Sequence, residues 1–149
     1  MKLKNIKQTI EILKKLNLPS SPIIRTRVFR ILTELEQEQA IITKLDESYK
    51  TEDFISNERK KYDFVKQFEN CNGILVFGIK VSPDKINDVV KGIESFNSTE
   101  VYKQYQEYVT YLETQYFITA DLLNIDELSD NIFVGLSSED VELLMEIIK

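Results

Sequence analysis

Apolar residues in the first third of the chain recur every three or four positions, which is the spacing of one face of an α-helix. One such stripe covers residues 3–17, and a second runs from near Ile23 to Tyr49. Pro19 and Pro22 lie between the stripes and disfavour helical geometry in the residues before them. We therefore predict two long amphipathic helices that form an antiparallel hairpin.

A third helical stretch, Phe54–Phe68, either continues the second helix or folds back on it. Thr51 is a suitable N-cap for a new helix, so we expect a break there. The pattern then changes. Asn70–Gly73 is a cluster of turn residues, and the segment after it, Gly73–Val81, is short, apolar and rich in β-branched side chains. We expect residues 73–81 to form one buried strand.

Two further segments of the second half are candidate strands, Tyr116–Thr119 and, better bounded by turn residues, Ile132–Val134. Helical spacing of apolar residues returns between Val81 and Tyr116 and again at the end of the chain. Its start signals are Ser82–Asp84 for one helix and Ser98 for the next. Ser137 and Asp140 have the spacing of a capping box, which predicts a last helix that begins there.

Together these elements predict a predominantly helical α+β fold. It consists of the N-terminal amphipathic helical hairpin and a small unit of two or three strands with packed helices. The 149 residues fit a single domain, 1–149, with a helical hairpin region at 1–69 and an α+β region at 70–149.

The composition removes most of the residues on which enzymes depend. The chain has no histidine, so the usual general base and the commonest metal ligand are missing. Its one cysteine, Cys71, has no histidine partner, and we expect a half-buried structural thiol beside a turn. No phosphate-binding glycine motif occurs. We therefore expect no enzyme, no cofactor and no metal, although the residues leave carboxylate chemistry formally open.

Features that direct a protein to a membrane or out of the cell are also missing. The basic start has no apolar core of a signal peptide, and the longest apolar run, Ile74–Ile79, is far shorter than the ~20 residues of a membrane span. A single cysteine forms no intrachain disulfide. We expect a cytoplasmic protein that does not enter a membrane.

Charge is distributed unevenly along the chain. Through Arg30 there are eight Lys or Arg residues and one acid, a net charge of +7, whereas the remaining eleven basic and twenty-four acidic residues give −13, for a total of −6. From Gln104 to Ile148 there are ten acids and no basic residue. Two interpretations stand equally: separate basic and acidic binding surfaces, or neutralisation of one segment by the other within the fold.

Tyrosines crowd the same acidic half, at Tyr102, Tyr105, Tyr108 and Tyr111. A position at the edge of the core is the first interpretation, and an aromatic contact surface is the second. For the acidic cluster around Asp126, a solvated loop is the simpler interpretation. The candidate residues of an acidic and aromatic partner-binding surface are Tyr105, Glu107, Tyr108, Glu113, Asp121, Asp126, Glu127 and Asp130. The candidate basic surface consists of Arg25, Arg27 and Arg30, which could contact phosphates.

The opening MKLKNIKQTIEILKKLNL, followed by a break and RTRVFRILTELEQE, resembles a family of small proteins from phages and prophages of Gram-positive bacteria. The ending GLSSEDVELLMEIIK is similar to the close of that family. The resemblance covers the first fifty and the last twenty residues. The family is a "domain of unknown function" group encoded near tail and lysis genes, so the resemblance implies phage origin and a bacterial host but no catalytic residue.

From these features we expect a phage or prophage accessory protein that acts by protein–protein binding. The leading form is inhibition of a host nucleic-acid-handling or defence enzyme, with the acidic surface in a basic channel. The first alternative is a tail-associated or assembly component that forms a homo-oligomer through the helical hairpin. The second alternative is a regulator that binds nucleic acid with the basic N-terminal helices.

Overall fold

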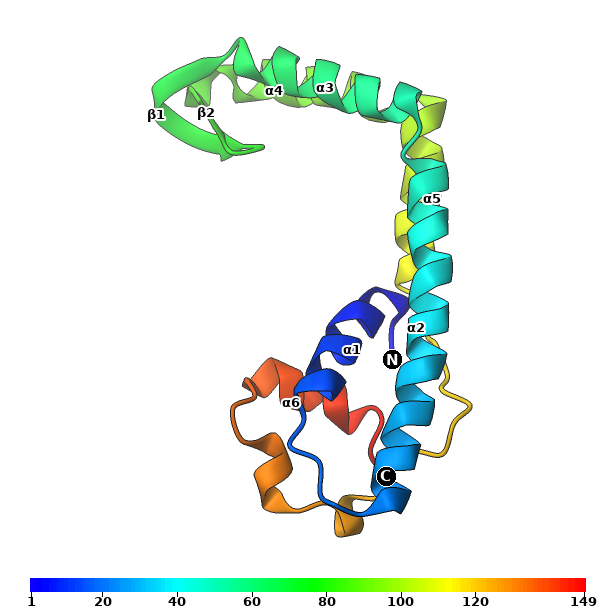
Figure 1. Ribbon diagram of the computed structural model, residues 1–149. Helices are drawn as coiled ribbons and strands as arrows, with labels where there is room; N and C mark the ends of the chain where they lie inside the picture. The colour runs from blue at the N-terminus through cyan, green and yellow to red at the C-terminus, as the bar shows by residue number, and fades with distance from the viewer. The chain divides into compact units, whose positions relative to one another are not determined.

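The computed structural model describes residues 1–149, with the side chain of Asp130 left out (Figure 1). It confirms the predominantly helical α+β class, because the described chain folds into six α-helices and one two-stranded antiparallel sheet. The helices are α1 (Ile6–Lys15), α2 (Pro22–Tyr49), α3 (Glu52–Lys66), α4 (Ile86–Asn97), α5 (Glu100–Leu112) and α6 (Ser138–Met145), and the strands are β1 (Glu69–Val76) and β2 (Ile79–Val81). Short 3₁₀ turns lie at Leu3–Asn5, Pro83–Lys85, Ile125–Glu127 and Asp130–Phe133.

The chain forms two compact units. Unit 1 comprises residues 1–44 and 110–149, and unit 2 comprises residues 45–109. These units do not follow the predicted regions 1–69 and 70–149, because the two ends of the chain associate. Within unit 1, the Leu3 amide donates to the Thr114 carbonyl at 3.1 Å, and the Tyr116 amide donates to the Met1 carbonyl at 2.7 Å.

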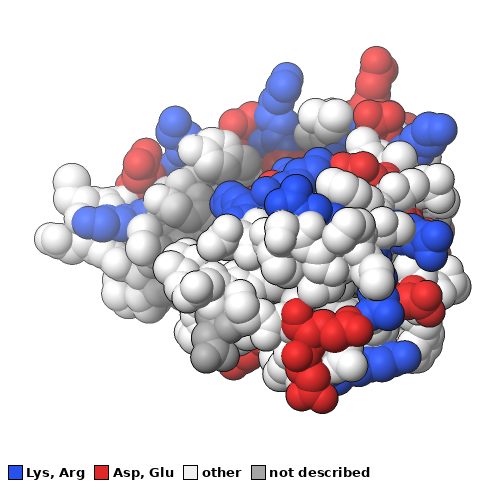
Figure 2. All heavy atoms as spheres, turned by 60° about the horizontal axis from the view of Figure 1, so that its bottom comes forward, with Lys and Arg blue, Asp and Glu red and all other residues white. Residues whose placement is uncertain are grey.

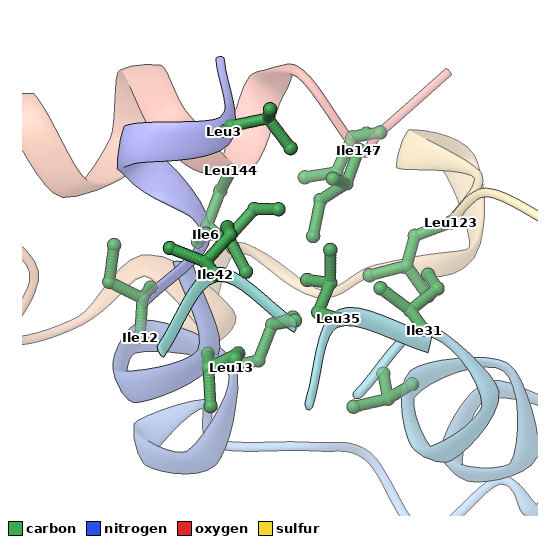
Figure 3. Close-up of a cluster of buried hydrophobic side chains, with 13 residues drawn as sticks. Leu3, Ile6, Ile12, Leu13, Ile31, Leu35, Ile42, Leu123, Leu144 and Ile147 are labelled. Carbon is green, nitrogen blue, oxygen red and sulfur yellow. The ribbon is translucent and has the colours of Figure 1, made fainter. Parts of the chain in front are cut away.

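Unit 1 has an aliphatic core (Figure 3), to which α1, α2, α6 and the segment around Leu123 contribute. The predicted stripe of α1 lies in it, with Ile6 and Leu13 at most 1% exposed. The break before α2 also lies where it was predicted. Side chains of α1 and α2 share this core, but the helix that α1 contacts most extensively is α6.

The break between α2 and α3 is confirmed. The Thr51 hydroxyl accepts a hydrogen bond from the Phe54 amide at 3.2 Å, so it caps α3 as expected. Unit 2 has its own small core of Val65, Val81 and Val89 with Ile79 beside them. Part of this core lies on α3 and α4, which contact each other, and part on β2.

The prediction of one buried strand over Gly73–Val81 is wrong. The segment is a hairpin in which Phe77 (φ 49°) and Gly78 (φ 74°) form the two-residue turn between β1 and β2. Positive φ at both turn positions matches the right-handed twist of the flanking strands. Only β2 is buried through its alternate residues, whereas the residues of β1 before Val76 are exposed.

The predicted turn cluster Asn70–Gly73 lies inside β1 as a bulge. Glu69 and Ile74 are both in register with Val81, so the four residues between them have no counterpart on β2. A Cβ atom on Gly73 would lie 2.1 Å from the Val81 carbonyl oxygen, so glycine is required for this close approach. Cys71, which was expected to be half-buried, is exposed on the bulge.

The other two predicted strands are also wrong. Residues 116–119 form no regular element. The backbone of Tyr116 bonds to Met1, next to an isolated bridge, and the amide and hydroxyl of Thr119 bond to Glu34 of α2. Ile132 and Phe133 lie in the 3₁₀ turn Asp130–Phe133, in which the Ile132 amide donates to the Ser129 carbonyl, and Val134 follows this turn. Both segments are short enough that tertiary contacts override their β propensity.

Among the predicted helix starts, the one at Ser137 is confirmed. The Ser137 hydroxyl accepts from the Asp140 amide at 3.1 Å, and the Asp140 carboxylate accepts from the Ser137 amide at 3.3 Å. The cap of α5 is Thr99 and not Ser98, since the Thr99 hydroxyl accepts from the Tyr102 amide. At Ser82–Asp84 a 3₁₀ turn precedes α4, and the Ser82 hydroxyl bonds to the Asp84 carboxylate.

Candidate functional site

Folding removes the charge asymmetry of the sequence. Unit 1 contains ten Lys or Arg and thirteen Asp or Glu residues, and unit 2 contains nine and twelve, so each unit has a net charge of −3. The basic beginning and the acidic end of the chain belong to the same unit. The neutralisation interpretation therefore explains much of the pattern that suggested two opposed surfaces.

Individual ion pairs carry this neutralisation. Lys2 and Lys4 both bond to Glu113, at 2.9 and 2.6 Å, and Arg27 pairs with Glu127. Hydrogen bonds from Lys4 and Lys2 hold the pKa of Glu113 below its ordinary value. These groups are largely exposed, and exposed pairs contribute little stability. They do mean that Glu113 and Glu127 already have partners within the chain.

Three of the predicted acidic residues line one groove of unit 1. Asp121, Asp126 and Glu127 surround a space of about 630 Å³ together with Arg27 and Lys149. Among the described side chains, Asp121 and Asp126 have no ion pair. The described residues hold no His, Cys, Asp and Glu cluster that fits a metal ion. The side chain of Asp130 lies outside what the structure describes.

The three predicted arginines do not converge on one phosphate-sized site. The Arg25 guanidinium donates to the Pro19 carbonyl at 2.9 Å, and Arg27 is paired with Glu127. Arg30 lines a separate groove of about 460 Å³ beside Glu34. On the face drawn in Figure 2, basic side chains lie directly beside a group of acidic ones.

Glu34 of α2 is the polar anchor of the segment after α5. Its carboxylate accepts from the Thr119 amide at 2.7 Å, the Ala120 amide at 2.8 Å, the Thr119 hydroxyl at 3.0 Å and the Tyr116 hydroxyl at 3.1 Å. Burial alone raises the pKa of this carboxyl, but the four hydrogen bonds outweigh burial and leave the pKa below its ordinary value. Burial, the larger cause, and the hydrogen bond to Glu34 together raise the pKa of Tyr116 to about 12.

Glu34→Gln should lower the free energy of unfolding by about 1–3 kcal/mol at neutral pH, since bonds to a charged acceptor are lost. A carboxyl group whose pKa is lowered by folding stabilises the folded protein at pH values above its unfolded-state pKa. This contribution is lost as the pH falls through the folded-state pKa. The difference between wild type and variant should therefore shrink below about pH 4.3. Urea unfolding of both proteins between neutral and acidic pH measures the difference in their free energies of unfolding. A difference that does not change with pH would contradict the role of the carboxylate.

The predicted aromatic surface is mostly internal to unit 2. The ring of Tyr105 stacks on Phe54 with a centroid distance of 4.2 Å, and Tyr108 stacks on Tyr49 at 5.2 Å. Tyr108 is 3% exposed, and burial, with the nearby Asp46 carboxylate, raises its pKa to about 12. Glu107 is exposed, so of these three predicted residues it is the one that faces solvent freely.

The β1–β2 hairpin is a surface that the sequence interpretation missed. Ile74, Leu75 and Phe77 are 53%, 65% and 53% exposed. Leu75 also lines a groove of about 760 Å³ with Lys80 and the bulged part of β1. The Phe–Gly pair in the middle of GILVFGIKV was the available signal, because a two-residue turn ending in glycine divides an apolar run into a hairpin.

Lys61 of α3 holds the hairpin turn in place. It is 4% exposed, and its ammonium group bonds to Glu58 at 2.8 Å and to Asn97 at 3.1 Å. The same ammonium lies 5.3 Å from the ring centre of Phe77 and 4.7 Å from that of Tyr102. Such cation–π contacts are strongest where water is excluded. The exposed apolar residues are therefore presented by a braced turn.

Comparison with protein-family models, with curated proteins and with solved structures found no match to this chain. In the described chain, each helix is too short or too polar to cross a bilayer.

Proposed function

We propose that this protein is not an enzyme and acts by binding another protein through the β1–β2 hairpin. The observation that carries the proposal is the exposure of Ile74, Leu75 and Phe77 on three nearly consecutive positions of a hairpin. Exposed apolar side chains are costly in water, and a group of them on one element commonly marks an interaction site. The bracing of Phe77 by Lys61 supports this role, since a preorganised surface loses less entropy on binding.

The class of partner follows from the resemblance of both chain ends to phage proteins. Under this proposal the protein is a phage or prophage accessory protein in the cytoplasm of a bacterial host. Its partner is a host protein, and an enzyme of defence or nucleic-acid handling is the leading candidate. The hairpin then serves as the anchor, because a few side chains buried at the centre of an interface supply most of its energy.

Affinity capture from a bacterial lysate tests the proposal with two matched variants. Leu75→Asp places a charge on the hairpin, whereas Phe117→Asp changes a residue of unit 1 that is 80% exposed. Wild type and Phe117→Asp should enrich the same protein, and Leu75→Asp should lose at least about 90% of it, as expected for a central anchor. Equal capture by all three proteins would refute the hairpin as the binding site.

A second candidate surface is the acidic groove of unit 1, favoured by the carboxylates of Asp121 and Asp126, which form no ion pair with a described side chain. In that case the groove meets a basic channel of the partner, and charge acts mainly on association rate and salt dependence. The double variant Asp121→Lys, Asp126→Lys in the same capture experiment measures this contribution. Sizing of the pure protein tests the alternative that it works as a homo-oligomeric assembly component.

A further inference from the structure

The free edge of β1 provides a specific mode of binding. We propose that β1 adds an extended segment of the partner protein as a third strand, a segment with alternating apolar residues and at least one Lys or Arg. This inference rests on the proposed function and specifies how the hairpin engages its partner. The described sheet has two strands, so β1 has one edge with no strand beside it.

The register identifies the backbone groups on that edge. Val76 and Ile79 flank the two-residue turn, and the hydrogen bond that closes such a turn joins these two residues. Pairs in an antiparallel ladder alternate between bonding each other and pointing their N–H and C=O groups outward. The next pair, Leu75 and Lys80, is therefore of the outward kind. Leu75 presents its N–H and C=O groups to the free edge of β1.

The free edge of β2 is less suitable for an added strand. β2 has three residues, carries the charge of Lys80 and is followed closely by Pro83, and these features protect edge strands from pairing. β1 has eight residues and contains neither Lys, Arg nor Pro. Its bulge between Glu69 and Ile74 protects the first half, which leaves the half around Leu75 open.

Charge determines the chemistry of the added segment. Glu69 is the one charged residue in the sequence of β1, and it lines the same groove as Leu75 and Lys80. Lys80 belongs to β2, so β1 separates it from a strand added to the free edge of β1, and Glu69 is the charge on the strand next to the added segment. A basic residue of the added segment can pair with Glu69 while an apolar one covers Leu75. A second copy of this chain is a poorer occupant, because each copy carries −6 overall and −3 on unit 2. Like charges across an interface oppose association.

The test uses a display library of random peptides about ten residues long, with the full-length protein as bait. We expect selected peptides to alternate apolar residues and to include Lys or Arg. Affinity of a selected peptide is measured by fluorescence polarisation. Glu69→Gln should weaken binding about two- to fivefold and reduce its salt dependence, as for a partly exposed ion pair.

Two proline variants separate the edges. Leu75→Pro and Lys80→Pro each remove one outward N–H and no bond between β1 and β2, which is where edge strands tolerate proline. Leu75→Pro should weaken the peptide at least about tenfold, and Lys80→Pro less than about twofold. Leu75→Thr removes the apolar side chain but keeps the N–H, so the peptide should lose less affinity for this variant than for Leu75→Pro. Equal losses in the two proline variants, or a larger loss in Lys80→Pro, would overturn the assignment to β1.

N-methylation of the peptide, one residue at a time, gives a readout that needs no folded variant. Strand addition predicts that every second methyl group abolishes binding, because alternate amides face β1. Insensitivity to all methyl groups would refute strand addition, yet the proposed function would stand if Leu75→Asp still abolished capture of the cellular partner. A dimer in solution that Leu75→Pro dissociates would show that a second copy occupies the edge, which also overturns the proposal.

Discussion

Replacing Leu35 with alanine is expected to lower the free energy of unfolding by about 2–5 kcal/mol. Leu35 is 0% exposed and lies in the aliphatic core of unit 1, near Ile31 on the same helix (Figure 3). Truncation removes buried methyl groups and leaves a cavity that the rigid neighbours fill only in part. Urea unfolding followed by far-ultraviolet circular dichroism measures the loss.

The matched control is Ile41→Ala on the same helix, at a residue that is 51% exposed. This control variant changes helix propensity and removes a side chain without creating a cavity. It should change the free energy of unfolding by less than about 0.5 kcal/mol. A loss below about 0.5 kcal/mol for Leu35→Ala as well would mean that the apolar stripe of α2 is not core, contrary to its burial.

Phe54→Ala should destabilise unit 2 by about 3–5 kcal/mol, the range for loss of a large buried aromatic ring. Phe54 is 8% exposed and stacks on Tyr105 at 4.2 Å, so its removal opens space beside α5 and loses the aromatic contact. Amide hydrogen exchange of the full chain should show faster exchange concentrated in residues 45–109.

Ile55 provides the comparison for this variant, since it is the next residue of α3 and is 49% exposed. Ile55→Ala should leave exchange in unit 2 nearly unchanged. If Phe54→Ala instead weakens partner capture without any loss of stability, the stack on Tyr105 is part of a binding surface. The aromatic interpretation of the tyrosine helix would then replace its assignment to the core.

The predicted acidic surface shows that the distribution of charges along the sequence does not reveal which of them form ion pairs. Lys2 and Glu113 are 111 positions apart in the chain, and Arg27 and Glu127 are 100 apart. The sequence shows that opposite charges are available at the two ends, but not that they meet. Only the association of the two ends in unit 1 decides that they do. Within the part of the chain that the structure describes, this leaves Asp121 and Asp126 without an ion pair in the acidic groove of unit 1.

The hairpin shows the same limit for hydrophobicity. The run Gly73–Val81 is apolar except for Lys80, so no alternation over its length distinguishes the buried side chains of β2 from the exposed ones of β1. Burial of Ile79 and Val81 is decided by their packing with Val65 of α3 and Val89 of α4. β1 has no second layer over Leu75, and its exposure is a property of what the rest of unit 2 leaves uncovered.

What the sequence determined by itself is the local structure. The cap of α3 at Thr51, the capping box of α6 and the apolar stripe of α1 each depend on groups within a few residues of one another. Such interactions form wherever the helix forms, which is why spacing predicts them. Strand pairing, the partners of charges and the exposure of the hairpin depend on segments far apart in the chain. Only the tertiary structure decided these, because they require distant backbone and side-chain groups to meet.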